Sequence, residues 1–275
     1  MKASTEIGFS TEHLIYLKKL NRQKQFVKTM QLALLAAFII IWEGAGRLGF
    51  INTFIISSPS RVAETIARLY SSGELMLHIG VTAAETAAGF LIGTALGTFA
   101  AILMWWSPTL SKILDPYMVV LNALPKIALG PILIVWVGAG MEAIIVMALL
   151  ISTIVTTMTV LTGFTEISSD RQLLMRTLGA SKTQTFLKVV LPASVPTIMS
   201  ALKLSVGMSW VGVIVGEYLV SKAGLGYLIV YGGQVFKLDL VMASIVILCV
   251  LAALMYYAVS ALETVLCRKT GKFTK

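Results

Sequence analysis

The segment TAAETAAGFLIGTALGTFAAILMWW, residues Thr82 to Trp106, decides the kind of fold that this chain adopts. Its only charged residue is Glu85, and its other residues are apolar, small or hydroxyl-bearing. About 20 mostly apolar residues are enough for a helix to cross the roughly 30 Å of hydrocarbon in a bilayer. We therefore expect this segment to be a membrane-spanning helix.

Five further segments match the same template, and the overall composition agrees. Hydrophobic residues make up 57% of the 275-residue chain and charged residues only 13%, too few to cover a water-soluble core. We therefore predict an all-α integral membrane protein with six transmembrane helices. The other five spans are expected near Thr29–Gly46, Ile113–Val137, Ala143–Phe164, Val195–Leu219 and Leu240–Leu266.

Three of the six spans carry further local signals. Ile113–Val137 is expected to be the least regular span, because each of its prolines removes a backbone donor. Small residues recur every fourth position in two other spans and predict close helix packing, within one chain or between two chains. The interrupting residues are Pro116, Pro125, Gly130 and Pro131; the repeated glycines are Gly89, Gly93 and Gly97, then Gly212 and Gly216.

The basic residues predict the orientation of the chain in the membrane. The net charge is +9, from 22 Lys and Arg against 13 Asp and Glu. With the N-terminus inside, cytoplasmic segments hold 15 of these basic residues and external loops hold five, as the positive-inside rule requires. Lys126 and Lys203 fall inside spans. Both termini are therefore expected in the cytoplasm, and we expect no nucleic-acid partner.

The segments outside the membrane are short. Residues 1–28 form a basic N-terminal segment, either an amphipathic helix on the membrane surface or a solvated tail. The membrane domain is expected over residues 29–266, followed by a basic cytoplasmic tail, 267–275. The sequence Ser58-Pro59-Ser60 predicts the start of a short helix in the first external loop.

One cytoplasmic loop, SSDRQLLMRTLGASKTQTFLKVVLP, residues Ser168 to Pro192, is too structured to be a plain connector. It predicts two short helices. Gly179 is placed to end the first helix, and Ser181 with Gln184 has the spacing of a capping box for the second. Pro192 is expected to stop the second helix.

This loop resembles the EAA signature of permease subunits in binding-protein-dependent ABC importers, specifically the nitrate, sulfonate and taurine branch. Gly179, Val189, Leu191 and Pro192 stand at the signature spacings, whereas the Glu-Ala-Ala positions are occupied by Leu173-Leu174-Met175. Three other stretches also resemble this family. They are Ala123–Leu129 with Pro131 and Trp136-Val137-Gly138, Gly216-Glu217-Tyr218, and Gly224–Tyr227.

The resemblance implies the type I importer architecture and a bacterial cytoplasmic membrane location. It implies two permease subunits, here a homodimer, with separate ABC ATPase subunits and an external substrate-binding protein. The loop would fit a groove on the ATPase and transmit its closure; the alternative is an amphipathic loop resting on the bilayer. The residues so assigned are Arg171, Leu173, Leu174, Met175, Arg176, Leu178, Gly179, Leu191 and Pro192.

ATP chemistry is expected on the partner. The chain contains no Gly-x-x-x-x-Gly-Lys-Ser/Thr motif, since Gly271-Lys272 is followed by Phe273. We therefore expect a non-catalytic subunit that binds no cofactor, with ATP and Mg used by the ATPase. No metal site is expected, because His13 and His78 are isolated and resemble polar surface side chains.

Polar residues inside spans are candidates for the transport path. A lysine is costly in lipid, so Lys126, beside broken backbone, either attracts an anionic substrate or is satisfied by carbonyls freed by Pro125 and Pro131. The full candidate set is Asn122, Lys126, Ser205, Ser209, Trp210 and Glu217, and ordinary packing is the alternative role for these side chains.

The expected substrate is a small anion such as a sulfonate, taurine or nitrate. A pyrimidine vitamin precursor is the alternative, because related systems carry such compounds. An ion-coupled secondary transporter and a non-transporting membrane scaffold are alternatives from other classes. The secondary transporter would leave the structured loop at residues 168–192 without a partner, and it predicts an acidic residue at a broken helix inside the membrane.

Overall fold

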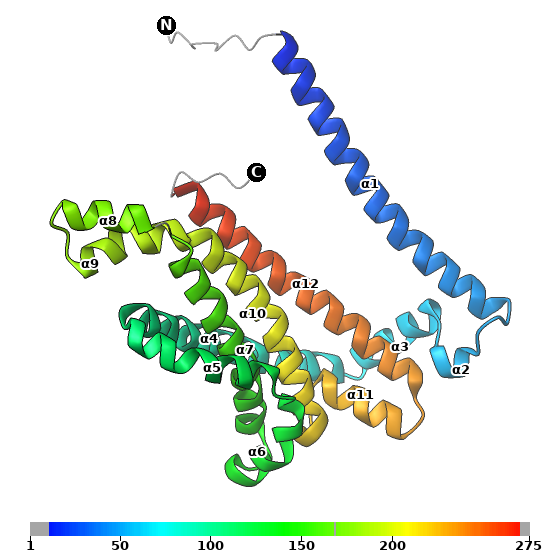
Figure 1. The fold of residues 1–275 in the computed structure, drawn as a ribbon. Helices are drawn as coiled ribbons and strands as arrows, with labels where there is room; N and C mark the ends of the chain where they lie inside the picture. The colour runs from blue at the N-terminus through cyan, green and yellow to red at the C-terminus, as the bar shows by residue number, and fades with distance from the viewer. Residues whose placement is uncertain (1–10, 168, 270–275) are drawn as a thin grey trace, which may run out of the picture. The chain divides into compact units, whose positions relative to one another are not determined.

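The computed structural model describes residues 11–167 and 169–269, and within these ranges the chain is all-α, with no strand (Figure 1). It divides into two compact units, one up to Ala63 and one from Glu64 onward. The basic tail expected at 267–275 lies mostly outside the described residues. The helices are α1 Thr11–Arg47, α2 Thr53–Ile56, α3 Pro59–Ser71, α4 Glu74–Trp106, α5 Pro108–Ala123, η1 Lys126–Leu129, α6 Gly130–Val137, α7 Met141–Thr165, α8 Ser169–Thr177, α9 Lys182–Thr185, η2 Phe186–Val190, α10 Leu191–Val220, α11 Leu225–Gln234 and α12 Leu238–Lys269.

In the first unit, α1 is one unbroken helix that joins the basic N-terminal segment to the first apolar span. Its last turns are tied to the start of α3. The carboxylate of Glu43 accepts hydrogen bonds from the Ser60 backbone N–H and hydroxyl, both at 3.1 Å, and from Arg47 at 2.7 Å. The predicted helix after Ser58 is confirmed as α3, which begins at Pro59.

In the second unit, α7 packs against both α4 and α10. The glycines repeated at every fourth position on α4 and α10 allow this close approach. Gly89 and Gly93 on α4 face Ala148 and Ser152 on α7. A methyl group added to Gly212 on α10 would come within 2.5 Å of the Ala148 Cα atom. The predicted close packing is therefore confirmed, and the structure places it within a single chain.

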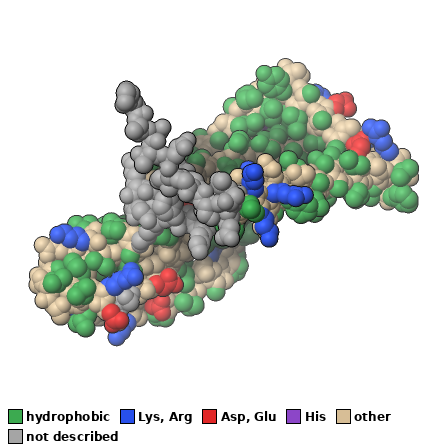
Figure 2. Space-filling view, turned by 90° about the horizontal axis from the view of Figure 1, so that it is seen from above, with side chains coloured by type: hydrophobic (Ala, Val, Ile, Leu, Met, Phe, Trp, Pro, Cys, Tyr) green, Lys and Arg blue, Asp and Glu red, His purple; other side chains and the backbone are tan. Residues whose placement is uncertain are grey.

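Among the described residues, five helices are long and apolar enough to cross a membrane, or six spans are present when α5 and α6 are counted as one broken span. The break occurs at Pro125 as predicted: α5 ends before this residue, and the two halves bend by 88°. Pro116, also predicted to interrupt the span, lies inside α5 without ending it. Hydrophobic side chains cover much of the visible surface, with charged side chains in small groups (Figure 2). The six-span prediction therefore agrees with the structure, although several helices extend beyond the apolar segments. Helices α2 and α11 were not expected.

The prediction that Pro192 stops a helix is wrong. Residues Phe186–Val190 form a π-helical turn, in which the Leu191 N–H donates to the Phe186 carbonyl. The helical path therefore continues through Pro192 without a break from Lys182 to Val220. Pro192 stands in the first turn of α10, where a missing N–H is tolerated, and the π turn changes the register just before it.

Candidate functional site

The elbow, which we define as α8, α9 and η2 (Ser169–Val190), connects the end of α7 to the start of α10 (Figure 1). Gly179 ends α8 as predicted, with a φ of +76° that favours glycine. Its N–H donates to the Arg176 carbonyl at 3.0 Å, and the Ala180 N–H donates to the Met175 carbonyl at 2.9 Å. These bonds satisfy the last carbonyls of α8 and turn the chain back sharply.

The start of α9 has the predicted capping box. The Gln184 N–H donates to the Ser181 hydroxyl at 3.2 Å, and the Ser181 N–H donates to the Gln184 side chain at 2.9 Å. Two backbone donors are thereby satisfied within four residues. The fold of the elbow is therefore encoded locally at its turn.

The far side of the elbow is anchored by aromatic packing. Phe186 is buried, and its ring centroid lies 4.8 Å from that of Trp105 on α4 and 5.4 Å from that of Phe164 on α7. Val190 and Ala201 complete the same apolar cluster. A displacement of the elbow would therefore be transmitted directly to α4, α7 and α10.

The coupling residues assigned from the resemblance do not all face the same way. Leu173 and Leu174 on α8 are 60% exposed and Leu178, just after α8, is 73% exposed, so the elbow presents apolar side chains that the described residues leave largely uncovered. Arg176 instead lines a cavity beside α4 and α5. The others lie as follows: Arg171 and Gly179 are exposed, and Met175, Leu191 and Pro192 are half-buried.

Lys126, the first path candidate, lies at the break between α5 and α6. Its ammonium group donates to the Asn122 carbonyl at 2.8 Å. That carbonyl belongs to the last turn of α5, where the break removes its helical donor. The structure therefore contains the interaction expected under the alternative role, in which a backbone carbonyl at the helix break binds the lysine. The carbonyl that does so is that of Asn122.

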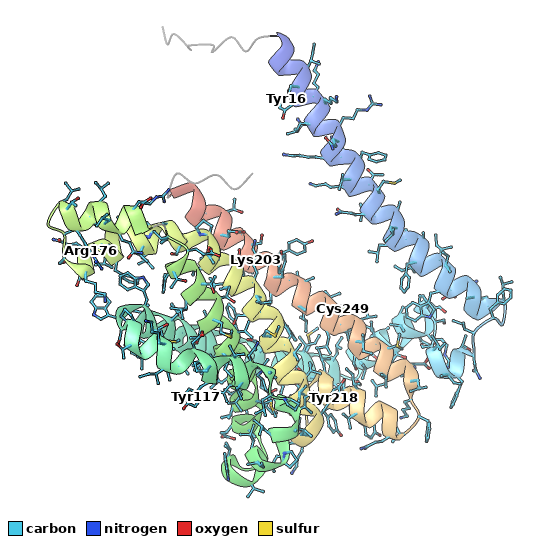
Figure 3. All side chains as sticks on the ribbon, in the orientation of Figure 1. Tyr16, Tyr117, Arg176, Lys203, Tyr218 and Cys249 are labelled. Atoms are coloured by element: carbon cyan, nitrogen blue, oxygen red, sulfur yellow. The ribbon has the colours of Figure 1, made fainter. Side chains whose placement is uncertain are left out.

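The remaining path candidates are buried on α10. Ser205 shares a 3.2 Å hydrogen bond with Thr94 on α4. Ser209 and the Trp210 indole N–H are buried without a hydrogen-bond partner among the described residues. Lys203, labelled in Figure 3, forms an ion pair with Glu263 on α12, which accounts for its charge within the bundle.

Glu217 belongs to a buried polar cluster that links α4, α10 and the start of α11. Its two carboxylate oxygens accept from the Thr82 hydroxyl at 2.6 Å and from the Gly226 N–H at 2.5 Å. Thr82 in turn accepts from the Leu225 N–H at 2.8 Å. Glu217 does not bond to Lys126 in this arrangement.

His78 completes this cluster, and its expected surface position is wrong. It is 7% exposed, and its Nδ1 accepts from the Gly224 N–H at 2.9 Å. Glu85, the single charge in the segment at Thr82–Trp106, is also buried, with one carboxyl oxygen unpaired. A single charged residue in an otherwise uncharged span is a sequence signal that could have indicated this buried cluster. No local sequence pattern indicated that His78 belongs to it. No group of three or more His, Cys, Asp or Glu side chains in the described ranges could hold a metal ion.

Comparison with known proteins assigns the family. Residues 93–272 match the family described as "Binding-protein-dependent transport system inner membrane component". A probable ABC transporter permease protein of Haemophilus influenzae is 32% identical over 83% of this chain and 92% of its own length. The putative aliphatic sulfonates transport permease protein SsuC of Bacillus subtilis is 29% identical over 96% of this chain and 95% of its own.

A solved structure supports the fold. The chain aligns with the inward-facing MetNI methionine ABC transporter at a TM-score of 0.61 and 20% identity, covering 69% of this chain and 94% of that one. The EAA-type loop, the broken third span and the family match all indicate the same protein family. This chain therefore belongs to the inner-membrane permease subunits of binding-protein-dependent ABC importers, in the sulfonate and taurine branch, and is a non-catalytic transport component.

Proposed function

We propose that this permease carries a small organic or inorganic anion, such as a sulfonate, taurine or nitrate, released by an external binding protein. The observation that carries the mechanism is a group of exposed leucines, Leu173 and Leu174 on α8 and Leu178 just after it, on an elbow anchored to three membrane helices. Exposed leucines on a short helix are typical of a buried partner contact. The partner is an ABC ATPase.

In this proposal α8 sits in a groove of the ATPase. Closure of the ATPase pair around ATP and Mg pushes α8, and the Phe186 contacts pass the displacement to Trp105 and Phe164. Access to the path then alternates between the two sides of the membrane. Both termini and the elbow lie in the cytoplasm, as the distribution of basic residues requires.

A second copy of the chain completes the assembly. Helix α5 has no buried residue within the chain, and its exposed apolar side chains include Tyr117 and Val120. A homodimer formed through this broken span would place Asn122 and Lys126 beside the path, with Ser205, Ser209, Trp210 and Glu217 supporting it from α10. Lys126 then provides the positive charge that favours an anion.

The coupling contact is tested with two leucines of equal exposure. Leu178 on the elbow is 73% exposed, and Leu48, after α1, is 74% exposed and lies on the predicted external side. Leu178→Glu should abolish co-purification of the ATPase and ATP-dependent uptake in vesicles, whereas Leu48→Glu should leave both intact. Normal ATPase binding by Leu178→Glu would contradict the proposal.

The substrate class is tested separately by uptake competition. Vesicles containing the permease, its ATPase and its binding protein should take up radiolabelled taurine or an alkanesulfonate only with ATP. Excess unlabelled sulfonate should suppress this uptake, and a neutral pyrimidine should not. Suppression by the pyrimidine alone would show that the substrate is a vitamin precursor and not an anion. The proposed coupling mechanism would be unaffected by that result.

A further inference from the structure

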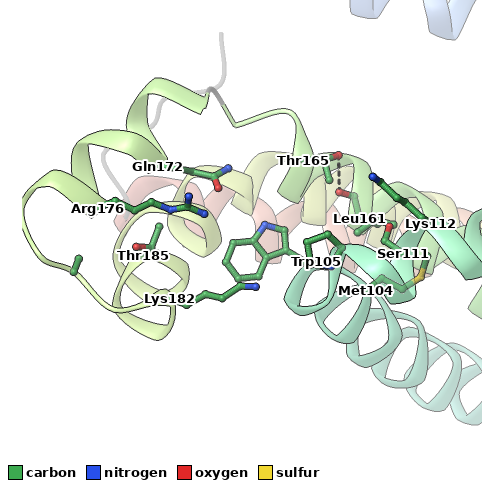
Figure 4. A pocket seen from close by; sticks show the side chains of 12 residues that line it. Met104, Trp105, Ser111, Lys112, Leu161, Thr165, Gln172, Arg176, Lys182 and Thr185 are labelled. Atoms are coloured by element: carbon green, nitrogen blue, oxygen red, sulfur yellow. Dashed lines mark hydrogen bonds between the residues drawn. The ribbon is translucent and has the colours of Figure 1, made fainter.

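A cavity of about 440 Å³ opens between the elbow and the turn that joins α4 to α5. Figure 4 shows Gln172 and Arg176 reaching from α8 toward the Trp105 indole, with Lys112 on the other side of this ring. Lys182, at the start of α9, lies next to the Trp105 ring. The exposed leucines of the elbow are not among its lining residues, so the cavity is separate from the proposed ATPase contact.

The charge of the cavity is entirely of one sign. Lys112, Arg176 and Lys182 line it, and no Asp or Glu does. Within the described residues, the side chains of Lys112 and Arg176 make no hydrogen bond or ion pair. The Lys182 ammonium group donates to the Trp106 carbonyl at 2.5 Å and lies 5.6 Å from the Trp105 ring centroid. Three cations drawn from three helices therefore line one cavity, and none of its described lining residues is acidic.

The remaining lining residues of the cavity are either uncharged polar or apolar. Gln172, Ser111 and Thr185 add uncharged polar groups beside the cations, and Met104 and Leu161 provide an apolar wall. Trp105 and Trp106 end α4, and tryptophan at the end of a spanning helix is typical of the membrane interface. The cavity lining thus combines cationic and polar groups with an apolar part.

We propose that this cavity binds a phosphate group of an anionic amphiphile or of a soluble phosphate. A guanidinium and two ammonium groups match the charge and the oxygen geometry of a phosphate, and basic pockets beside spanning helices suit anionic lipid headgroups. The bound group bridges Lys112 on α5 to Arg176 on α8. It therefore holds the elbow against the membrane helices and favours one position of the coupling surface.

The purified permease in detergent provides a test that needs no ATPase, so its outcome is independent of the proposed transport function. Calorimetric titration with dioctanoyl phosphatidylglycerol should show binding, and the same titration with dioctanoyl phosphatidylcholine should not. Lys112→Gln combined with Arg176→Gln should weaken binding on the order of 25-fold, because each basic side chain contributes about fivefold near an anionic surface. The charge-matched control, Arg68→Gln with Lys237→Gln, should bind as the wild type does.

Three outcomes of this experiment are decisive. Equal affinity of the Lys112/Arg176 double variant and the wild type overturns the proposal, as does equal binding of the two lipids. Competition by millimolar inorganic phosphate identifies a soluble phosphate as the source, and its absence identifies the lipid. Should the double variant fail to fold, Lys112→Gln alone, on an exposed side chain, should still weaken binding about fivefold.

Discussion

The Thr82 hydroxyl on α4 donates a 2.6 Å hydrogen bond to the Glu217 carboxylate on α10, joining residues 135 positions apart in the sequence. The same hydroxyl accepts from the Leu225 N–H, and Glu217 also accepts from the Gly226 N–H. The turn after α10 is therefore held by side chains from two membrane helices.

Replacement of Glu217 by Gln should loosen this turn. The Gln amide keeps one acceptor oxygen but presents an NH2 donor in place of the other, so either Thr82 or the Gly226 N–H loses its acceptor, at a cost of about 1–3 kcal/mol. Thermal unfolding in detergent should show a lower Tm, and hydrogen exchange at residues 221–226 should quicken. Glu142→Gln, at an exposed position on α7, is the control and should behave as the wild type does. Unchanged hydrogen exchange in the Glu217 variant would show that Glu217 does not hold the turn after α10.

Replacement of Gly212 by Ala should destabilise the bundle, because the added methyl group would meet the Ala148 backbone at 2.5 Å. Overpacking of this kind costs typically about 1–3 kcal/mol. Gly207 lies on the same helix with nothing within 4 Å of an added methyl group, so Gly207→Ala should be neutral or slightly stabilising. Equal Tm values for the two variants would contradict the packing of α10 on α7.

Replacement of Gly179 by Val should misdirect α8 without any clash, since an added Cβ atom there meets open space. The cost is conformational, about 1–2 kcal/mol for a left-handed residue. We expect weaker ATPase binding with little change in Tm. Asn tolerates this conformation, so Gly179→Asn should retain most of the binding. Loss of binding by both variants to the same extent would point to a contact made by the glycine itself.

Replacement of Lys126 by Met should reduce anion uptake if the charge lies on the path. Lys126→Arg keeps the charge and should retain most of the transport. Both variants disturb the bond to the Asn122 carbonyl, so a Tm measurement separates stability from transport. Unchanged uptake by Lys126→Met would leave this lysine with the structural role alone.

Several features of this protein were determined by the sequence itself. The spans follow from runs of apolar residues, and the break in the third span follows from Pro125, which lacks a donor. The caps of the elbow follow from Gly179 and from Ser181 with Gln184. All of these are local, because each depends on residues within one or two turns of the chain.

Other features were decided only by the tertiary structure. The sequence showed glycine stripes on two spans but not their common partner, which is α7 with Ala148. It did not show that a π turn carries the helix through Pro192, nor that His78 and Glu217 are both held at the start of α11. Pairing between helix faces depends on how several helices pack at once, so the periodicity within each helix leaves the partner undetermined.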